Sequence, residues 1–276
     1  PLHEVSYRGC FKPQLPAYFI DRLSKPGDVV YDPFSGRGTT AIEAALMGRN
    51  IIANDVNPLS AILTRPRLQV PLIAAIDVRL RAIRMNAKIR NDIDLSMFYH
   101  PDTERELLNL RAWLAERRES CMEDDADRWI RMVATNRLTG HSPGFFSTYT
   151  LPPNQAVSPE SQIKINEKTG KAPEYRDVRA LILRKSMQLQ SEINAAARWR
   201  LQQAAIGAQF HCGPAEKTPG IADNSVQLTV TSPPFLNVVQ YAKDNWLRCW
   251  FNSLDAEQIG AGITMASSVN EWSEVM

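Results

Sequence analysis

Residues 29–40 read VVYDPFSGRGTT, and this stretch decides the fold. A short β-branched run ends at Asp32, two glycines follow one residue apart, and an Ala-rich run with helical spacing begins near Thr39. This order predicts a strand, a tight turn and a helix. Gly36 and Gly38 leave the backbone free to adopt positive φ, and the start of the helix directs amide hydrogens at the same turn. The turn is therefore suited to a nucleotide-like ligand.

A second apolar run follows at residues 50–54 and ends in Asp55. About twenty residues after the glycines of a doubly wound sheet, a carboxylate accepts hydrogen bonds from ribose hydroxyls. The glycines and the acid alone are also compatible with a dinucleotide-dependent oxidoreductase and with an ordinary βαβ turn.

The full sequence of the turn is more specific than its two glycines alone. DPFSGRGTT at residues 32–40 resembles the Asp-Pro-Phe-x-Gly-x-Gly-Thr signature of S-adenosylmethionine-dependent amino-methyltransferases that act on DNA bases. NDVNP at residues 54–58 is similar to the acidic strand end that follows this signature. The resemblance implies S-adenosyl-L-methionine as the cofactor. It assigns cofactor binding to Asp32, Pro33, Phe34, Ser35, Gly36, Gly38, Thr39, Thr40, Asn54, Asp55 and Asn57.

A second motif lies where the apolar run at residues 226–230 ends, in TSPPF. Ser-Pro-Pro-Phe at a strand end resembles the catalytic motif of the same family, which reads Asp, Asn or Ser, then Pro-Pro, then Tyr or Phe. An exocyclic amino group is a weak nucleophile because it is conjugated with the base, so the site must orient its lone pair. The Ser232 oxygen and the Pro233 carbonyl are suited to accept its two hydrogens, and Phe235 to stack on the ring. The implied catalytic residues are Ser232, Pro233, Pro234 and Phe235.

An amino group inside a duplex is reached only when the base is flipped out of the stack. Side chains after the motif are expected to line the base pocket or to hold the DNA backbone. Serine at the head of the motif favours cytosine N4 over adenine N6 as the target. The alternatives are an adenine-N6 enzyme, an RNA amino-methyltransferase, and a catalytically silent nucleic-acid-binding subunit. The candidate substrate-binding residues are Asn237, Tyr241, Lys243, Lys164 and Lys168.

Composition excludes several classes of protein. The chain has 276 residues, of which 44% are hydrophobic, but no apolar run approaches the length of about 20 residues that a membrane helix needs. The first residues lack the pattern of a signal peptide. The four cysteines are scattered and neither they nor the four histidines show metal-ligand spacing. We therefore expect a cytoplasmic protein with reduced thiols, without a bound metal and without a membrane partner.

The expected fold class is α/β, with a Rossmann-like class I methyltransferase sheet and a mostly helical insertion. Residues 1–66 and 207–276 are assigned to the catalytic domain, with strands near 29–31, 50–54, 208–213 and 226–230. Such a sheet has seven strands, so it is expected to be incomplete after the fourth, and a later part of the protein or a partner chain would supply the rest. GPAE at residues 213–216 departs from the family's Gly-Asp-Ala. Glu216 or a backbone group would then have to substitute for the family's acidic contact to the adenine amino group.

Residues 67–206 are assigned to the helical insertion, a candidate target-recognition region. Apolar spacing predicts helices over residues 17–24, 73–90, 101–118, 124–137 and 173–205. Between residues 61 and 200 there are 23 basic and 17 acidic side chains, a modest surplus that suits a DNA partner.

The segment at residues 139–155 is rich in Gly, Pro, Ser and aromatic residues, and a polar segment with three lysines follows it at residues 158–171. Both are expected to be loops. They either contact DNA phosphates and bases or form a surface excursion that packs its aromatic side chains inward.

Overall fold

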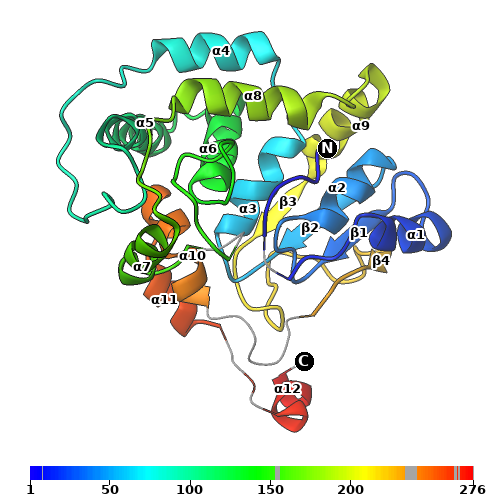
Figure 1. Cartoon of the computed structure of the whole chain (residues 1–276). Helices are drawn as coiled ribbons and strands as arrows, with labels where there is room; N and C mark the ends of the chain where they lie inside the picture. Colours follow the sequence, from blue (N-terminus) through cyan, green and yellow to red (C-terminus); the bar gives the residue numbers. More distant parts are fainter. Residues whose placement is uncertain (8, 153–155, 234–240, 264–265, 267, 276) are drawn as a thin grey trace. The chain divides into compact units, whose positions relative to one another are not determined.

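The computed structural model describes the chain except residues 8, 153–155, 234–240, 264–265, 267 and 276 (Figure 1). The predicted site residues Pro234, Phe235 and Asn237 lie outside the described residues, as does the side chain of Tyr241. Internal contacts divide the chain into two compact units. The sheet unit comprises Pro1–Val70, Glu192–Gln240 and Glu257–Met276, and the helical unit comprises Pro71–Ser191 and Tyr241–Ala256.

The sheet unit is built on four parallel strands in the order β3-β2-β1-β4. Residue Val29 of β1 is level with Asn50 of β2, and Tyr31 of β1 is level with Thr229 of β4. The expected α/β fold with a four-stranded parallel sheet is confirmed, and the strand order agrees with that of a Rossmann-like methyltransferase. The strands are β1 (Val29–Asp32), β2 (Asn50–Asn54), β3 (Gln209–His211) and β4 (Leu228–Thr229).

Helix α2 (Thr39–Leu46) packs on β1 and β2, and α1 (Gln14–Leu23) and α9 (Ala195–Gly207) pack on α2 (Figure 1). The three alanines of α2 are all buried, and their small side chains let the helix approach the sheet closely. The unit also contains α3 (Leu59–Thr64), the short 3₁₀ helix η1 (Arg65–Arg67) and α12 (Val269–Val275).

The helical unit is organised around α6 (Asp125–Arg137), of which eleven residues are buried. Trp129 of this helix is fully buried and donates its indole N–H to the Ser186 hydroxyl at 2.9 Å. The other helices are α4 (Ile73–Ala82), α5 (Pro101–Glu119), α7 (Pro159–Thr169), α8 (Val178–Gln190) and α10 (Tyr241–Phe251); α11 (Ala256–Ala261) begins in this unit and continues in the sheet unit.

Three predictions of local structure were wrong. The helix expected over residues 173–205 is two helices, because α8 ends at Gln190 and the Asn194 side chain accepts from the Ala197 amide to start α9. The polar segment expected to be a loop contains α7, whose start is fixed by a hydrogen bond from the Ser161 amide to the Ser158 hydroxyl. The helix expected over residues 73–90 ends at Ala82.

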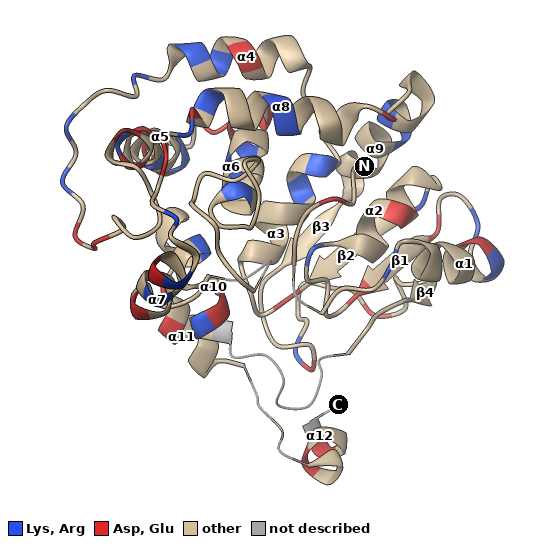
Figure 2. Ribbon diagram, in the orientation of Figure 1, with Lys and Arg blue, Asp and Glu red and all other residues tan. Residues whose placement is uncertain are grey.

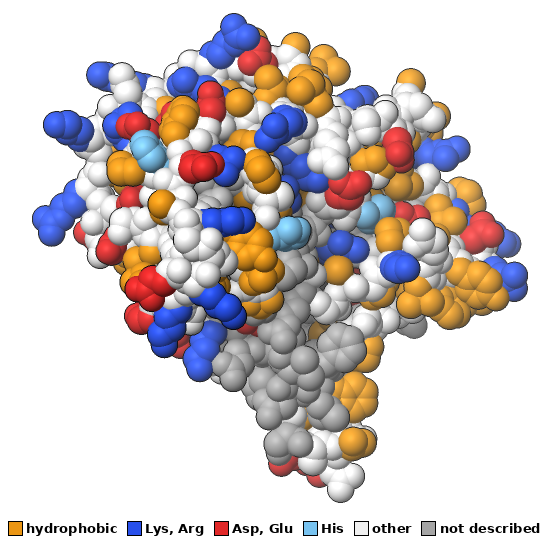
Figure 3. All heavy atoms as spheres, viewed as in Figure 1, with side chains coloured by type: hydrophobic (Ala, Val, Ile, Leu, Met, Phe, Trp, Pro, Cys, Tyr) orange, Lys and Arg blue, Asp and Glu red, His pale blue; other side chains and the backbone are white. Residues whose placement is uncertain are grey.

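One face of α1 is apolar and exposed. Its large side chains recur at helical spacing, and the hydrophobic side chains at the α1 end stand out in Figure 3. The exposed side chains of this face of α1 are Leu15, Tyr18, Phe19 and Leu23.

Strand β4 lies at one edge of the sheet. Within the described part of the chain, β4 pairs with β1 only. The completion of the sheet by further strands stays a prediction.

No helix in the described part of the chain is both long and apolar enough to cross a membrane.

Gly38 should be irreplaceable for packing. Its φ is +74°, and a Cβ there would lie 2.2 Å from the hydroxyl of Thr64, which is fully buried. We expect Gly38→Ala to lower the free energy of unfolding by about 2 to 4 kcal/mol, from backbone strain and overpacking together. Urea denaturation measures this.

Gly27→Ala is the matched control, because Gly27 has a φ of +93° with nothing within 4 Å of the added Cβ. It should cost roughly 1 to 2 kcal/mol, the backbone part alone. Equal losses in the two variants would contradict the packing argument.

Candidate functional site

The carboxyl ends of the four parallel strands meet at one edge of the sheet. The strand order reverses between β1 and β4, and ligands of open α/β sheets bind in the crevice at such a point. Thr231, just after β4, donates its hydroxyl to the carboxylate of Asp32, the last residue of β1, at 2.6 Å. Because Ser232 and Pro233 follow directly in the chain, the structure brings the start of the second motif to the glycine turn.

The glycine turn is tied to the end of β2. The Asp55 carboxylate accepts from the Gly36 amide at 2.7 Å and from the Asn57 amide at 3.0 Å. The Asn54 side chain donates to the carbonyls of Pro33 and Gly213 at 3.3 and 2.9 Å. Gly213 follows β3, so the ends of three strands share one hydrogen-bonded network. Glu216, just beyond it, is exposed.

The N-terminal segment covers the turn, and two of the residues responsible were missed from the sequence. The Tyr7 ring lies beside Gly36, where a Cβ would be 3.4 Å from it, and its hydroxyl accepts from the Asn57 side chain at 2.8 Å.

Arg37, between the two glycines, donates to the carbonyls of Val5 and Phe11 at 3.0 and 3.2 Å, and to that of His3. A long cation between two turn glycines was the available signal for Arg37. Thr231 was also missed, although it directly precedes the Ser-Pro-Pro-Phe motif.

Two buried carboxylates dominate the electrostatics of this edge. Burial raises the pKa of Asp32 to about 6, against the opposing effects of the Thr231 hydroxyl and the Phe34 amide. Burial also raises the pKa of Asp55, against the Asn57 and Gly36 amides. The charge of Asp55 adds to the shift at Asp32. A positively charged ligand with hydroxyl donors complements such an edge, since it satisfies the carboxylates and offsets their repulsion.

Unsatisfied polar atoms mark the same place. In the described part of the chain, Ser35 Oγ is buried without a hydrogen-bond partner. Asp32 Oδ2 and Thr40 Oγ1 are buried without a hydrogen bond of ordinary geometry, although the Thr40 hydroxyl lies near enough to lower the pKa of Asp32. Buried polar groups are rarely left unpaired unless a ligand or water completes them. In addition, the N-cap of α2 is Gly38, so no side chain caps the amides of its first turn. These groups fit S-adenosyl-L-methionine, which carries ribose hydroxyls, an amino group, a carboxylate and a positive sulfonium.

The other predicted site residues are spread over the chain. Phe34 and Thr39 lie on the glycine turn and at the start of α2, and Phe34 donates its amide to Asp32 at 3.2 Å. Lys164 and Lys168 lie on α7 and Lys243 on α10, all exposed and all in the helical unit. Their contact with a substrate stays a prediction. Among the described residues, no three His, Cys, Asp or Glu side chains gather as a metal site would need.

A strand-turn-helix with a carboxylate at the end of the next strand is typical of nucleotide-type cofactor sites in open α/β sheets. Residues 3–61 match the family model described as DNA methylase, of the N6/N4 group. This match contains the glycine turn, Asp55 and Asn57, and ends before the Ser-Pro-Pro-Phe motif.

Two curated relatives extend the comparison. The chain is 41% identical over 63 residues to the type II methyltransferase M.MjaII of Methanocaldococcus jannaschii, covering 23% of this chain and 12% of that protein. It is 23% identical over 280 residues to the type II methyltransferase M.BsoBI of Geobacillus stearothermophilus, covering 92% of this chain and 53% of that protein. The chain thus spans about an eighth and about half of the length of these relatives. The comparisons relate it to the N6/N4 DNA methylases and, more distantly, to type II methyltransferases.

The raised pKa of Asp32 should appear in the pH dependence of stability. Between pH 4 and about 6 the unfolded chain has lost this proton while the folded chain keeps it, so Asp32 lowers stability as the pH rises. A pKa shift of this size lowers the free energy of unfolding by about 3 kcal/mol at neutral pH. We expect Asp32→Asn to gain stability relative to the wild type over this window, with a constant difference above pH 7, in urea titrations at each pH.

Asp21→Asn removes an exposed carboxylate of the same unit and serves as the control. A difference between Asp32→Asn and the wild type that stays flat from pH 4 to 7 would contradict the assignment of a buried, protonatable Asp32.

Proposed function

We propose that this protein transfers a methyl group from S-adenosyl-L-methionine to the exocyclic amino group of a flipped DNA base, with cytosine N4 as the first choice. The observation that carries the proposal is the Thr231–Asp32 hydrogen bond, because it joins the catalytic motif to the cofactor turn. The match of residues 3–61 to the DNA methylases supports DNA as the substrate.

The cofactor is assigned to the edge formed by the glycine turn and the end of β2. When bound, S-adenosyl-L-methionine supplies a methyl group made electrophilic by the positive sulfur. Asp55 is proposed to accept from the ribose hydroxyls, and Asp32 to favour the positive part of the cofactor through its buried charge. The buried hydroxyls of Ser35 and Thr40 are proposed to bind polar groups of the same ligand.

Ser232 and Pro233 are proposed to orient the amino group of the target base. The serine oxygen and the proline carbonyl accept its two hydrogens, which directs the nitrogen lone pair toward the methyl group. Proline restricts the backbone, so the carbonyl is held in place before the substrate arrives. Pro234 and Phe235 keep the roles that the resemblance implies, a rigid turn and a stacking surface for the base.

The helical insertion at residues 67–206 is proposed to carry target recognition, with Lys164 and Lys168 at phosphates. Asn237, Tyr241 and Lys243, which follow the Ser-Pro-Pro-Phe motif, are proposed to line the base pocket or to hold the DNA backbone. Serine at the head of the motif favours cytosine N4. Adenine N6, an amino group in RNA and a silent binding subunit are the other candidates. The remaining strands of the sheet are proposed to come from a later part of the protein or a partner, and the cytoplasm is the proposed location.

The substrate is tested by labelling. The protein is incubated with tritiated cofactor and plasmid DNA, the DNA is digested to nucleosides, and the labelled nucleoside is identified. We expect N4-methylcytidine in its deoxy form. Label on adenine would move the assignment to N6, label only on competing structured RNA would replace the substrate, and tight cofactor binding without transfer would indicate the silent subunit.

Substitutions of Ser232 and Asp55 should affect different quantities, methyl transfer for Ser232 and cofactor binding for Asp55. Ser232→Ala should reduce methyl transfer roughly 100-fold or more, as loss of an orienting oxygen does, while cofactor affinity stays near that of the wild type. Asp55→Asn should weaken cofactor binding roughly 10-fold or more, since two amides and the ribose lose a charged acceptor. Isothermal titration and the labelling assay measure the two quantities.

Ser225→Ala is the control for the serine variant, because the Ser225 hydroxyl donates within its own exposed turn, to the Ala222 carbonyl at 2.6 Å. A fully active Ser232→Ala would show that the catalytic assignment is wrong.

A further inference from the structure

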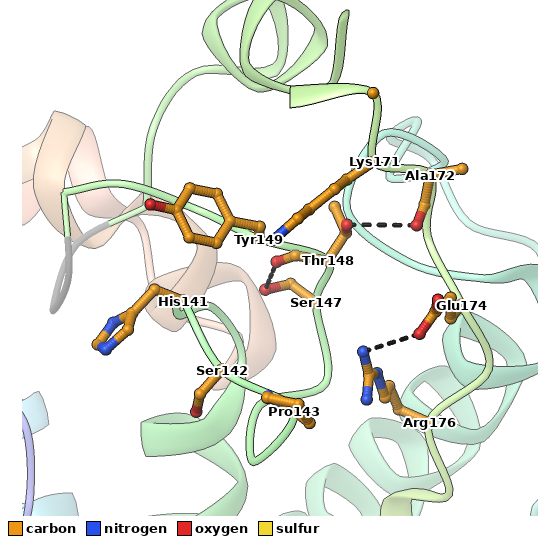
Figure 4. Close-up of a pocket in the computed structure, with 11 residues that line it drawn as sticks. His141, Ser142, Pro143, Ser147, Thr148, Tyr149, Lys171, Ala172, Glu174 and Arg176 are labelled. Carbon is orange, nitrogen blue, oxygen red and sulfur yellow. Dashed lines mark hydrogen bonds and ion pairs between the residues drawn. The ribbon is translucent and has the colours of Figure 1, made fainter. Parts of the chain in front are cut away.

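The helical unit contains a hollow that the proposed chemistry does not use. It has a volume of about 320 Å³ and is lined by two segments, residues 141–149 and 170–176 (Figure 4). Its size falls at the lower end of the range for small-ligand sites, roughly 300 to 1,000 Å³. The hollow lies wholly within one unit, so it can be described without reference to the sheet unit.

Hydrogen bonds and packing within the helical unit hold the walls of the hollow in place. The Thr148 amide donates to the Phe98 carbonyl at 2.9 Å, and the Thr148 hydroxyl donates to the Ala172 carbonyl at 3.3 Å, which ties the two segments together. Phe146 is fully buried beneath, and a Cβ on Gly140 would lie 2.4 Å from the Phe145 ring. The aromatic side chains that pack inward thus build a preformed site, and little ordering is left for a ligand to impose.

The lining carries a surplus of positive charge. The Lys171 ammonium lies 4.4 Å from the centre of the Tyr149 ring, and no acidic partner for it is found among the residues that the structure describes. On another wall the Arg176 guanidinium pairs with Glu174 at 3.1 Å. Two cations face one carboxylate, which favours a ligand with a single negative charge, such as a phosphodiester.

The remaining lining suits the rest of a nucleotide. Figure 4 shows the rings of His141 and Tyr149 on the same side of the hollow, and Ser142 also contributes to its lining. Aromatic rings offer stacking surfaces to nucleobases, and hydroxyls bond phosphate and sugar oxygens. We propose that this hollow binds one nucleotide of the DNA substrate, separate from the base that is methylated, with its phosphate at Lys171 and its base against His141 and Tyr149.

The neighbouring helix extends the cationic side of the hollow. Lys164 and Lys168 are four residues apart on α7, which ends just before Lys171, and all three are exposed. Helix α7 also carries Glu160 and Glu167, and Figure 2 shows both signs of charge on it. The helix by itself is therefore no basic surface, and the phosphate contact is assigned to Lys171. The inference rests on the proposed function only for the identity of the polymer, DNA.

The test measures binding of the full chain to a fluorescent duplex of about 20 base pairs over a range of salt concentrations. Lys171→Ala should weaken binding and lower the slope of log affinity against log salt by about one. Tyr149→Ala should weaken binding roughly 5- to 100-fold through lost stacking, with the slope unchanged. Lys171→Arg and Tyr149→Phe keep the charge and the ring and should bind like the wild type, which separates the contact from a folding defect.

Lys88→Ala is the matched control, because Lys88 is an exposed cation of the same unit outside the hollow. An equal loss in Lys88→Ala, or wild-type binding by both Lys171→Ala and Tyr149→Ala, would overturn the inference. Equal competition by structured RNA would overturn the choice of DNA.

Cofactor affinity, measured on the same variants, should not change. Failure of the wild type to transfer methyl groups while these variants still lose DNA affinity would sink the proposed function alone. Normal DNA affinity in these variants beside an inactive Ser232→Ala would sink the inference alone.

Discussion

The hydrogen bond between the Thr231 hydroxyl and the Asp32 carboxylate is the interaction on which the candidate site depends. It joins two strand ends that are about two hundred residues apart in the sequence, at the point where the strand order reverses. Pairing of β1 with β4 alone would place the two motifs side by side but would not fix the distance between them. The side-chain contact fixes the start of Ser-Pro-Pro-Phe against the end of β1, so in the proposed function the methyl donor and the acceptor would share one edge of the sheet.

The same edge keeps two carboxylates out of water, which is unfavourable in the absence of a ligand. Amides of the glycine turn and of Asn57 satisfy Asp55, while one oxygen of Asp32 stays unpaired. The N-terminal segment makes this possible, since Tyr7 lies beside the turn and Arg37 binds three carbonyls of that segment. Buried charges are common at functional sites, although their burial is unfavourable, because a ligand that compensates the buried charge binds selectively.

The helical unit serves a different purpose from the sheet unit in this interpretation. Its core surrounds α6 and combines apolar side chains such as Trp129 with buried polar ones such as Asp127. Its irregular segment at residues 139–155 contains the fully buried Phe146. What remains on the surface of that segment is polar and aromatic, and the neighbouring segment at residues 170–176 adds two cations to the lining of a hollow of modest size. Recognition of DNA and transfer of the methyl group would then use separate sets of residues, so that either could change without loss of the other.

The sequence by itself determined the strand-turn-helix at residues 29–46, the acid after β2 and four strands, because these depend on local propensity and on a distinctive motif. It did not determine the break between α8 and α9 or the helical state of residues 159–169. Apolar spacing continues across the break between α8 and α9. At residues 159–169 the capping Ser158 outweighs the polar composition. Only the tertiary structure decided that Thr231 meets the end of β1, that Tyr7 lies beside the turn and that Arg37 reaches from the turn to the N-terminal segment, because contacts across such separations depend on strand order and packing.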